Sequence, residues 1–361
     1  MEKKTTEPMC YEACVRKLEQ GERLDREQWR TLIDGYSQPR AADLARRAGV
    51  LRDRIYGKKV FVRGLIEFTN YCRNDCYYCG IRRSNRKVCR YRLTEGEILS
   101  CCRAGYALGF RTFVLQGGED SYFTDERIVS IVQKIREEFP ECAVTLSIGE
   151  KKKESYAAFR EAGADRYLLR HETADADHYR QLHPPELTLE NRITCLRELK
   201  RLGFQTGAGF MVGSPGQTTE TLIDDMQFLE ELQPEMVGIG PFIPHHDTPF
   251  REQAAGTLEQ TLYLLSLVRL LLPQVLLPAT TALGTIAPGG REAGILAGAN
   301  VVMPNLSPEN VREKYLLYDN KICTGKEAAE CLEDLKASMA AIGYQVVIDR
   351  GDHISYQKER K

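Results

Sequence analysis

Eight short β-rich segments alternate with helical segments from residue 60 onward, and this alternation restricts the fold more than any other feature. The β-rich segments hold β-branched and aromatic residues, whereas most of the intervening segments space apolar residues three and four apart. Glycines end several of these helices just before the next strand begins. The predicted strands cover residues 60–68, 112–116, 143–148, 166–171, 204–212, 235–240, 276–281 and 299–303.

This order of elements predicts an α/β protein, a (β/α)8 TIM-type barrel over residues 59–304. A doubly wound open sheet is the alternative arrangement of the same units. Residues 1–58 carry helical patterns without a strand signal, so we expect an N-terminal helical extension there. Residues 305–361 are expected to form a C-terminal helical tail that completes a cavity. Active sites of such barrels lie at the C-terminal ends of the strands.

Composition and charge exclude several classes of function. The net charge is −1 over 361 residues, which argues against a nucleic-acid surface and against a basic membrane patch. The N-terminus has no apolar signal segment and no later run has membrane-spanning length, so we expect a cytoplasmic protein. We also expect a monomer. Twelve cysteines in a reducing compartment favour metal binding over disulfides.

Three of these cysteines, Cys72, Cys76 and Cys79, follow the spacing C-x3-C-x2-C directly after the first predicted strand. Thiolates are ligands for zinc or for iron–sulfur clusters. Structural zinc takes four protein ligands, and ferredoxin-type clusters take four cysteines. Three cysteines on a four-iron cluster leave one iron open for a substrate or cofactor. A partial zinc site, a chance cluster and an electron-transfer iron–sulfur protein are the alternatives.

This motif, with Tyr78 before the last cysteine, resembles the radical S-adenosylmethionine (SAM) superfamily. The resemblance implies one 4Fe-4S cluster on the three cysteines, with its open iron chelated by SAM. It also implies an external electron donor, because reductive cleavage of SAM gives a 5′-deoxyadenosyl radical. A catalytic and metal-binding role of Cys72, Cys76 and Cys79 is therefore expected.

Further motifs narrow the resemblance to the HydE family, the radical SAM maturases of FeFe-hydrogenase. They include "VLQGGED", "GADRYLLRHETA", "GFMVGSPGQT", "PATTALGTIAPGGRE" and "YDNKIC", in this order between about residues 60 and 323. The family implies radical attack on a sulfur of a cysteine-bound iron carbonyl–cyanide substrate. It also implies two partners, a tyrosine-cleaving maturase and a scaffold GTPase. A methylornithine synthase-like mutase acting on lysine is the alternative within the superfamily.

The resemblance also assigns site residues. Those implied to bind the cofactors are Tyr78, Gln116, Gly117, Gly118, Glu119, Glu172 and Arg192. Those implied to line the substrate cavity are Arg170, Met236, Thr280, Thr281, Met303 and Tyr315.

Simpler structural roles remain open for several of these residues. Arg170 and Glu172 could form a structural ion pair, and the two methionines could fill the core. The alternation of the first predicted strand turns Arg63 and Glu67 into the lumen of the barrel, with its apolar residues toward the helices.

Some HydE proteins carry a second cluster on C-x7-C-x2-C near the C-terminus. Cys323 and Cys331 keep the first gap here, but Asp334 occupies the third position. Two thiolates and one carboxylate make a poor cluster site, so we predict that no second cluster is present. His245 and His246 lie in a proline-bounded segment and are interpreted as loop residues.

Overall fold

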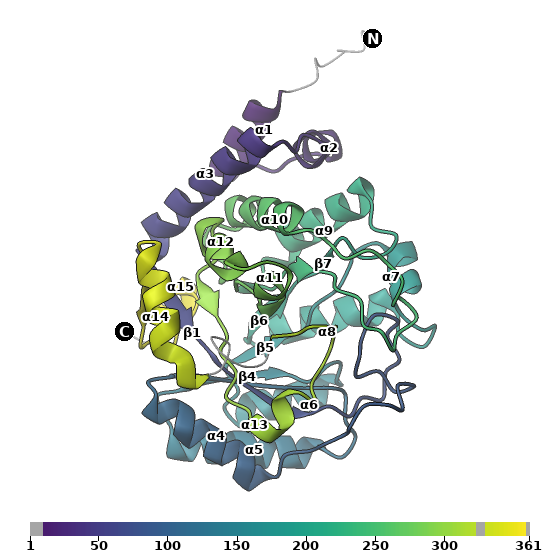
Figure 1. The fold of residues 1–361 in the computed structure, drawn as a ribbon, viewed down its shortest axis with the longest axis vertical. Helices are drawn as coiled ribbons and strands as arrows, with labels where there is room; N and C mark the ends of the chain where they lie inside the picture. The colour runs from purple at the N-terminus through teal and green to yellow at the C-terminus, as the bar shows by residue number, and fades with distance from the viewer. Residues whose placement is uncertain (1–9, 323–328, 359–361) are drawn as a thin grey trace.

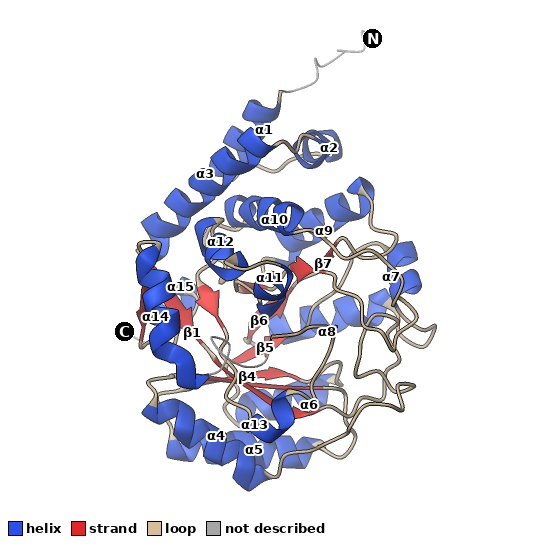
Figure 2. Cartoon of the chain, in the orientation of Figure 1, coloured by secondary structure: helices blue, strands red, loops and turns tan. Residues whose placement is uncertain are grey.

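The computed structural model describes residues 10–322 and 329–358, and its strands lie at the centre with most helices around them (Figures 1 and 2). The strands are β1 (Lys59–Val62), β2 (Gly64–Thr69), β3 (Thr112–Gly117), β4 (Ala143–Ser147), β5 (Arg166–Leu168), β6 (Gln205–Ala208), β7 (Met211–Val212), β8 (Met236–Val237), β9 (Gly240–Pro241), β10 (Val301–Val302) and β11 (Gln345–Val347). The helices are α1 (Tyr11–Glu19), α2 (Arg26–Asp34), α3 (Gln38–Tyr56), α4 (Glu95–Ala107), α5 (Asp125–Glu138), α6 (Lys153–Glu161), α7 (Ala176–Leu182), α8 (Leu189–Arg201), α9 (Thr219–Leu232), α10 (Leu258–Leu271), α11 (Thr281–Ile286), α12 (Gly290–Leu296), α13 (Glu309–Arg312), α14 (Leu332–Ala341) and α15 (Ile354–Lys358), with a short 3-10 turn η2 (Ala329–Cys331).

The central sheet is parallel and has the order β2-β3-β4-β5-β6-β8. Each strand is followed by at least one helix before the next strand of this sheet, which is the β-α-β arrangement that parallel pairing requires. In the register of β2 and β3, Glu67 lies opposite Gln116, so these two side chains share one face of the sheet. The observed class is therefore α/β with a parallel sheet.

The predicted closed barrel is not formed as a continuous ladder among the described residues. Beyond β8 the ring is interrupted, because Met236 to Leu276 and Pro278 to Val301 are isolated bridges, and it resumes where β10 pairs with β1. The predicted strand at 276–281 is wrong because Pro278 has no N–H to donate and because α11 already begins at Thr281.

Three predicted strands are interrupted. The segment 60–68 divides at Arg63 into β1 and β2, which belong to different sheets. The segment 204–212 divides into β6 and β7, and the segment 235–240 into β8 and β9 (Gly240–Pro241). The pieces β7 and β9 pair with each other as a separate two-stranded sheet at the ends of the main strands.

The tail contributes a strand that the sequence patterns did not predict. β11 pairs in parallel with β1, and β1 also pairs with β10. After β11 the chain is held by ion pairs to the base of the sheet, Arg166 to Asp352 at 2.7 Å and Arg350 to Asp165 at 2.9 Å. Arg166 lies at the first position of β5 and is fully buried. The C-terminal segment therefore covers the end of the sheet opposite the strands' C-terminal ends.

The N-terminal helices pack on the outside of the sheet-and-helix layer, where α1 and α3 lie beside α10 (Figure 1). The Tyr263 hydroxyl of α10 donates to the Tyr11 hydroxyl of α1 at 3.1 Å. Among the described residues, no helix is long and apolar enough to cross a bilayer.

Candidate functional site

The three cysteines lie on one long loop between β2 and α4, and this loop is fastened by its own polar groups. Asn70 donates to the carbonyl of Cys89 at 2.9 Å and accepts from the Tyr91 N–H at 2.8 Å. The Arg90 guanidinium donates to the carbonyls of Ile81 and Arg82 at 2.8 and 2.6 Å. Because buried backbone groups need partners, these bonds fix the loop without regular secondary structure.

The pKa values of the three cysteine thiols are raised. Burial raises the pKa of the Cys72 thiol. Burial, and then the nearby Cys79 and Cys72, raise the pKa of Cys76 well above the usual value, and burial followed by Cys72 raises that of Cys79 to about 12. The three sulfurs are thus close enough to repel one another as thiolates. A bound cation reverses this effect and deprotonates coordinating thiols.

The end of β3 touches the cysteine loop. A Cβ at Gly118 would lie 2.2 Å from the Tyr71 carbonyl oxygen and 2.7 Å from the Cys72 Cβ, so only glycine fits. The next residue, Glu119, is buried, and its carboxylate accepts from Arg73 Nε at 3.0 Å and from the Glu150 N–H at 2.8 Å. The predicted cofactor loop and the predicted cluster loop are therefore in direct contact.

A chain of polar contacts links the ends of β3, β4 and β5 to α8. Arg192 of α8 contacts Glu150 Oε1 through Nε at 2.5 Å, and its Nη1 donates to the Arg170 carbonyl at 2.5 Å. Asn191 donates to the other Glu150 oxygen at 2.6 Å. Arg192 was predicted to hold a cofactor carboxylate, and in the structure it is engaged with Glu150, a residue that the sequence motifs did not indicate.

Arg170 and Glu172 follow β5, and their side chains lie 3.1 Å apart, Nη2 to Oε2. Glu172 has a left-handed backbone, φ 66°, and its N–H donates to the Gly209 carbonyl at 3.0 Å. Such a conformation is strained for a residue with a side chain and persists where surrounding contacts impose it. It fixes the direction in which the Glu172 carboxylate leaves the sheet.

A fully buried pair stands behind Glu172. His171 Nδ1 accepts from the Gly209 N–H at 3.2 Å, so the proton of the neutral ring is on Nε2, which lies 3.3 Å from Asp225 Oδ1. The same Asp225 oxygen accepts from the Ala174 N–H at 2.6 Å. Burial lowers the pKa of His171 to about 3 and raises that of Asp225. The pair thus supports the backbone near Glu172, through the Gly209 N–H and the Ala174 N–H.

Tyr78 is positioned by His183, the residue that follows α7. Its hydroxyl lies 3.1 Å from His183 Nε2 and its ring meets the His183 ring edge to face. Burial is the main cause of the raised pKa of the Tyr78 hydroxyl, and the nearby Glu172 and Cys76 raise this pKa further. No sequence pattern pointed to His183.

The tail segment 313–322 crosses from the cysteine loop to the interior of the sheet, and we call it the strap. The Leu317 carbonyl accepts from the Gly80 N–H at 2.8 Å, directly after Cys79. Inside, Lys321 Nζ contacts Glu67 Oε1 at 2.5 Å, and Asn305 donates to the other Glu67 oxygen at 2.9 Å. Glu67 is fully buried.

The strap also carries two tyrosines inward. Tyr315, a predicted cavity residue, is 2% exposed, and Gln116 bonds to its hydroxyl, whose pKa burial raises. Tyr318, which was not predicted, is half-buried, and Thr285 bonds to its hydroxyl. The structure therefore brings the predicted Gln116 and Tyr315 together on the inner side of the strap.

The two predicted methionines belong to one packed apolar cluster. Met236 of β8 packs with Phe61 and Leu276, and Met303 packs against the same group. The Met236 sulfur accepts from Arg63 Nη1 at 2.9 Å, and burial lowers the pKa of Arg63. Both methionines therefore make core contacts, and Arg63 joins them in the interior.

Thr280 and Thr281 lie where α11 begins. The Thr281 carbonyl accepts from the Thr285 hydroxyl at 3.0 Å. The Thr280 hydroxyl is buried and has no hydrogen-bond partner among the described residues. A Cβ at Gly240 would lie 2.8 Å from it, so the hydroxyl abuts β9.

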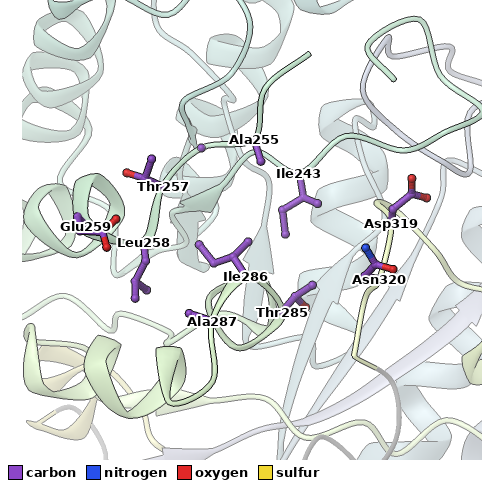
Figure 3. A pocket seen from close by; sticks show the side chains of 11 residues that line it. Ile243, Ala255, Thr257, Leu258, Glu259, Thr285, Ile286, Ala287, Asp319 and Asn320 are labelled. Carbon is purple, nitrogen blue, oxygen red and sulfur yellow. The ribbon is translucent and has the colours of Figure 1, made fainter. Parts of the chain in front are cut away.

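Outside the strap, a surface hollow of about 460 Å³ lies between α10, α11 and the strap residues Asp319 and Asn320 (Figure 3). Figure 3 shows Ile243 and Ile286 facing each other across it. None of the described residues that line it is a predicted site residue. The hollow therefore lies at the rim, not at the thiols.

The residues present fit the cofactors that the motifs imply. Three thiols can hold iron and leave one iron without a protein donor. Two buried polar atoms, Arg170 Nε and Thr280 Oγ1, lack hydrogen-bond partners among the described residues, and Arg170 Nη2 and Glu172 Oε2 meet each other only as an ion pair at 3.1 Å. Buried polar groups are normally satisfied, so a charged polar ligand would complete them. SAM carries the ammonium, carboxylate and hydroxyl groups that can do so.

The prediction that no second cluster is present concerns Cys323, Cys331 and Asp334. Cys323 lies outside the described residues. Cys331 ends the turn η2, and Asp334 lies in the first turn of α14.

Comparison with known proteins agrees with the geometry. The model of the radical SAM superfamily matches residues 66–229. The chain is 48% identical over 296 residues, 82% of this chain and 84% of the relative, to the [FeFe] hydrogenase maturase subunit HydE of Thermotoga maritima. It is 30% identical to the 3-methylornithine synthase of Methanosarcina barkeri, over 85% of this chain and 86% of the relative.

A solved structure shows the same architecture. Crystalline methylornithine synthase superimposes with a TM-score of 0.83 at 28% identity, covering 92% of this chain and 97% of its own. Membership of the superfamily implies a 4Fe-4S cluster and SAM as cofactors. The cysteine loop, the matching fold and the 48% identity together show that this chain is a radical SAM enzyme and belongs to the HydE family.

Proposed function

We propose that this chain is a maturase of FeFe-hydrogenase that acts on the sulfur of a cysteine-bound iron carbonyl–cyanide substrate. Its catalytic unit is residues 59–304, the strap and tail close the cavity, and the helices of 1–58 are an extension. The observation that carries the proposal is the hydrogen bond at 2.8 Å from the Gly80 N–H, directly after Cys79, to the Leu317 carbonyl, which joins the cysteine loop to the strap.

The chain's own residues would bind the cofactors, orient the substrate and exclude water from it. Cys72, Cys76 and Cys79 would hold one 4Fe-4S cluster, and Glu119, Glu172 and Arg192 with the Gly117–Gly118 backbone would hold SAM. When bound, the cluster and SAM supply reductive cleavage to a 5′-deoxyadenosyl radical. The unpartnered atoms of Arg170 and Thr280 would orient the charged substrate, and the strap would exclude water from it.

We further propose that the chain works as a cytoplasmic monomer. By its family it would receive its substrate from a tyrosine-cleaving maturase and pass its product to a scaffold GTPase. It would carry no second cluster, so reconstituted protein should hold about four irons per chain.

Anaerobic reconstitution with SAM, a reductant and the iron carbonyl–cyanide substrate tests the proposal. Substrate consumption with formation of adenosyl products is the expected result. Turnover of lysine in place of that substrate would contradict it and would favour a methylornithine synthase-like mutase, the activity named for the 30% identical relative.

A further inference from the structure

The loop that carries the three cysteines is strongly basic on its outer side. Residues 71–92 contain seven lysines and arginines but a single acidic residue, in a chain with 50 basic and 51 acidic residues overall. Arg127, from α5, joins the loop because it and Arg92 both stack on the Tyr122 ring, at 3.8 and 4.7 Å. We call the following set of exposed side chains the basic face: Arg73, Arg83, Arg86, Lys87, Arg92 and Arg127.

Three of the carboxylates that pair with this face are turned inward, whereas Glu186, 3.6 Å from Arg83, is itself exposed. The Arg73 side chain is 65% exposed whereas its partner Glu119 is 7% exposed. Lys87 is 79% exposed whereas Asp247 is 11% exposed, and Asp120, which holds Arg92, is 3% exposed. At these three pairs solvent meets the cations rather than their counter-charges, and cations outnumber exposed carboxylates on the loop, so its outer side presents a positive field.

We propose that the basic face docks an acidic one-electron carrier protein, of the iron–sulfur or flavin type, over the cysteine loop. The inference rests on the proposed function only in requiring a cluster on these cysteines. The reduced carrier gives one electron to the oxidised cluster and leaves oxidised by one electron, and no proton or group is transferred.

Three features select this occupant. A radical SAM enzyme needs an electron from outside, and the basic face belongs to the same loop as the iron ligands. Electron-transfer encounters use small interfaces that opposite charges steer, rather than large apolar ones. Tyr122 is 46% exposed between two guanidinium groups, and tyrosine and arginine are the side chains most often central to protein interfaces.

Charge reversal tests the docking site on the reconstituted enzyme. Arg83→Glu with Arg86→Glu changes two exposed arginines that hold none of the proposed ligands. The matched control is Arg16→Glu with Arg46→Glu, two exposed arginines of α1 and α3 with the same change in net charge. An acidic two-cluster ferredoxin is the probe, its affinity is measured by calorimetry and its reduction of the enzyme by stopped-flow spectroscopy.

At low ionic strength the Arg83/Arg86 variant should bind the ferredoxin about tenfold or more weakly than the unaltered enzyme. The ferredoxin should also reduce it about tenfold or more slowly, and both differences should shrink as salt is added. The control variant should match the unaltered enzyme, and photoreduced deazaflavin should reduce all three equally. Equal affinity of the two double variants, or affinity indifferent to salt, would overturn the docking proposal. Failure to assemble any cluster would instead overturn the proposed function, and iron analysis detects it before a carrier is added.

Discussion

The contact between Lys321 of the strap and Glu67 of β2 should contribute strongly to the stability of the fold. Lys321 is 6% exposed and Glu67 is 0% exposed, and Lys321 also donates to the Tyr315 carbonyl at 2.9 Å. Replacing Lys321 by Met leaves Glu67 buried with Asn305 as its remaining side-chain donor among the described residues. Removing one partner of a buried ion pair costs about 3–5 kcal/mol, so this is the expected loss in the free energy of unfolding.

Urea denaturation of the protein without cofactors measures this loss. Glu67→Gln should also destabilise, but Glu67→Gln combined with Lys321→Met should lose much less than the sum of the two, because no unpaired charge remains. Lys336→Met is the matched control, since Lys336 forms an exposed pair with Glu333 on α14, and it should cost less than about 0.5 kcal/mol. Additive losses, or a loss below about 1 kcal/mol for Lys321→Met, would refute the buried pair.

Three other changes have definite expected outcomes. Gly118→Ala should displace the cysteine loop and lower the iron bound after reconstitution, whereas Gly96→Ala, with open space around it, should not; iron analysis decides. Asp225→Ala should lose about 1–3 kcal/mol in urea denaturation because a buried backbone N–H loses its acceptor, and Asp225→Asn should lose less. Hydrogen bonding to Asp319 raises the pKa of His246, so its stabilisation is present below the unfolded pKa of about 6.5 and is lost as pH rises. The Tm deficit of Asp319→Asn should therefore shrink from about pH 6 to about pH 8.5.

The local parts of the site were predictable from sequence, because their signals are short-range. Three cysteines at fixed spacing after a strand, and glycines at the end of the next strand, need no knowledge of distant segments. The structure places Gly118 against Cys72, and both residues belong to these short motifs.

The long-range parts could not be read in this way. Glu150, His183 and Lys321 reach the site from three separate segments. Glu150 and His183 lie outside the quoted motifs, and Lys321 lies in "YDNKIC", a motif that gave the lysine no role. The closed barrel was expected because eight β-rich segments are present, but Pro278 and the early start of α11 interrupt the ring. β11 was missed because its three residues follow a helical tail and become a strand only by pairing with β1.

The EPR spectrum of the reduced, reconstituted enzyme with and without SAM tests the central claim most directly. With about four irons per chain on three thiolates, one iron is open, so SAM should change the spectrum of the cluster. Zinc bound by four side chains, or a cluster whose spectrum is the same with and without SAM, would contradict the account.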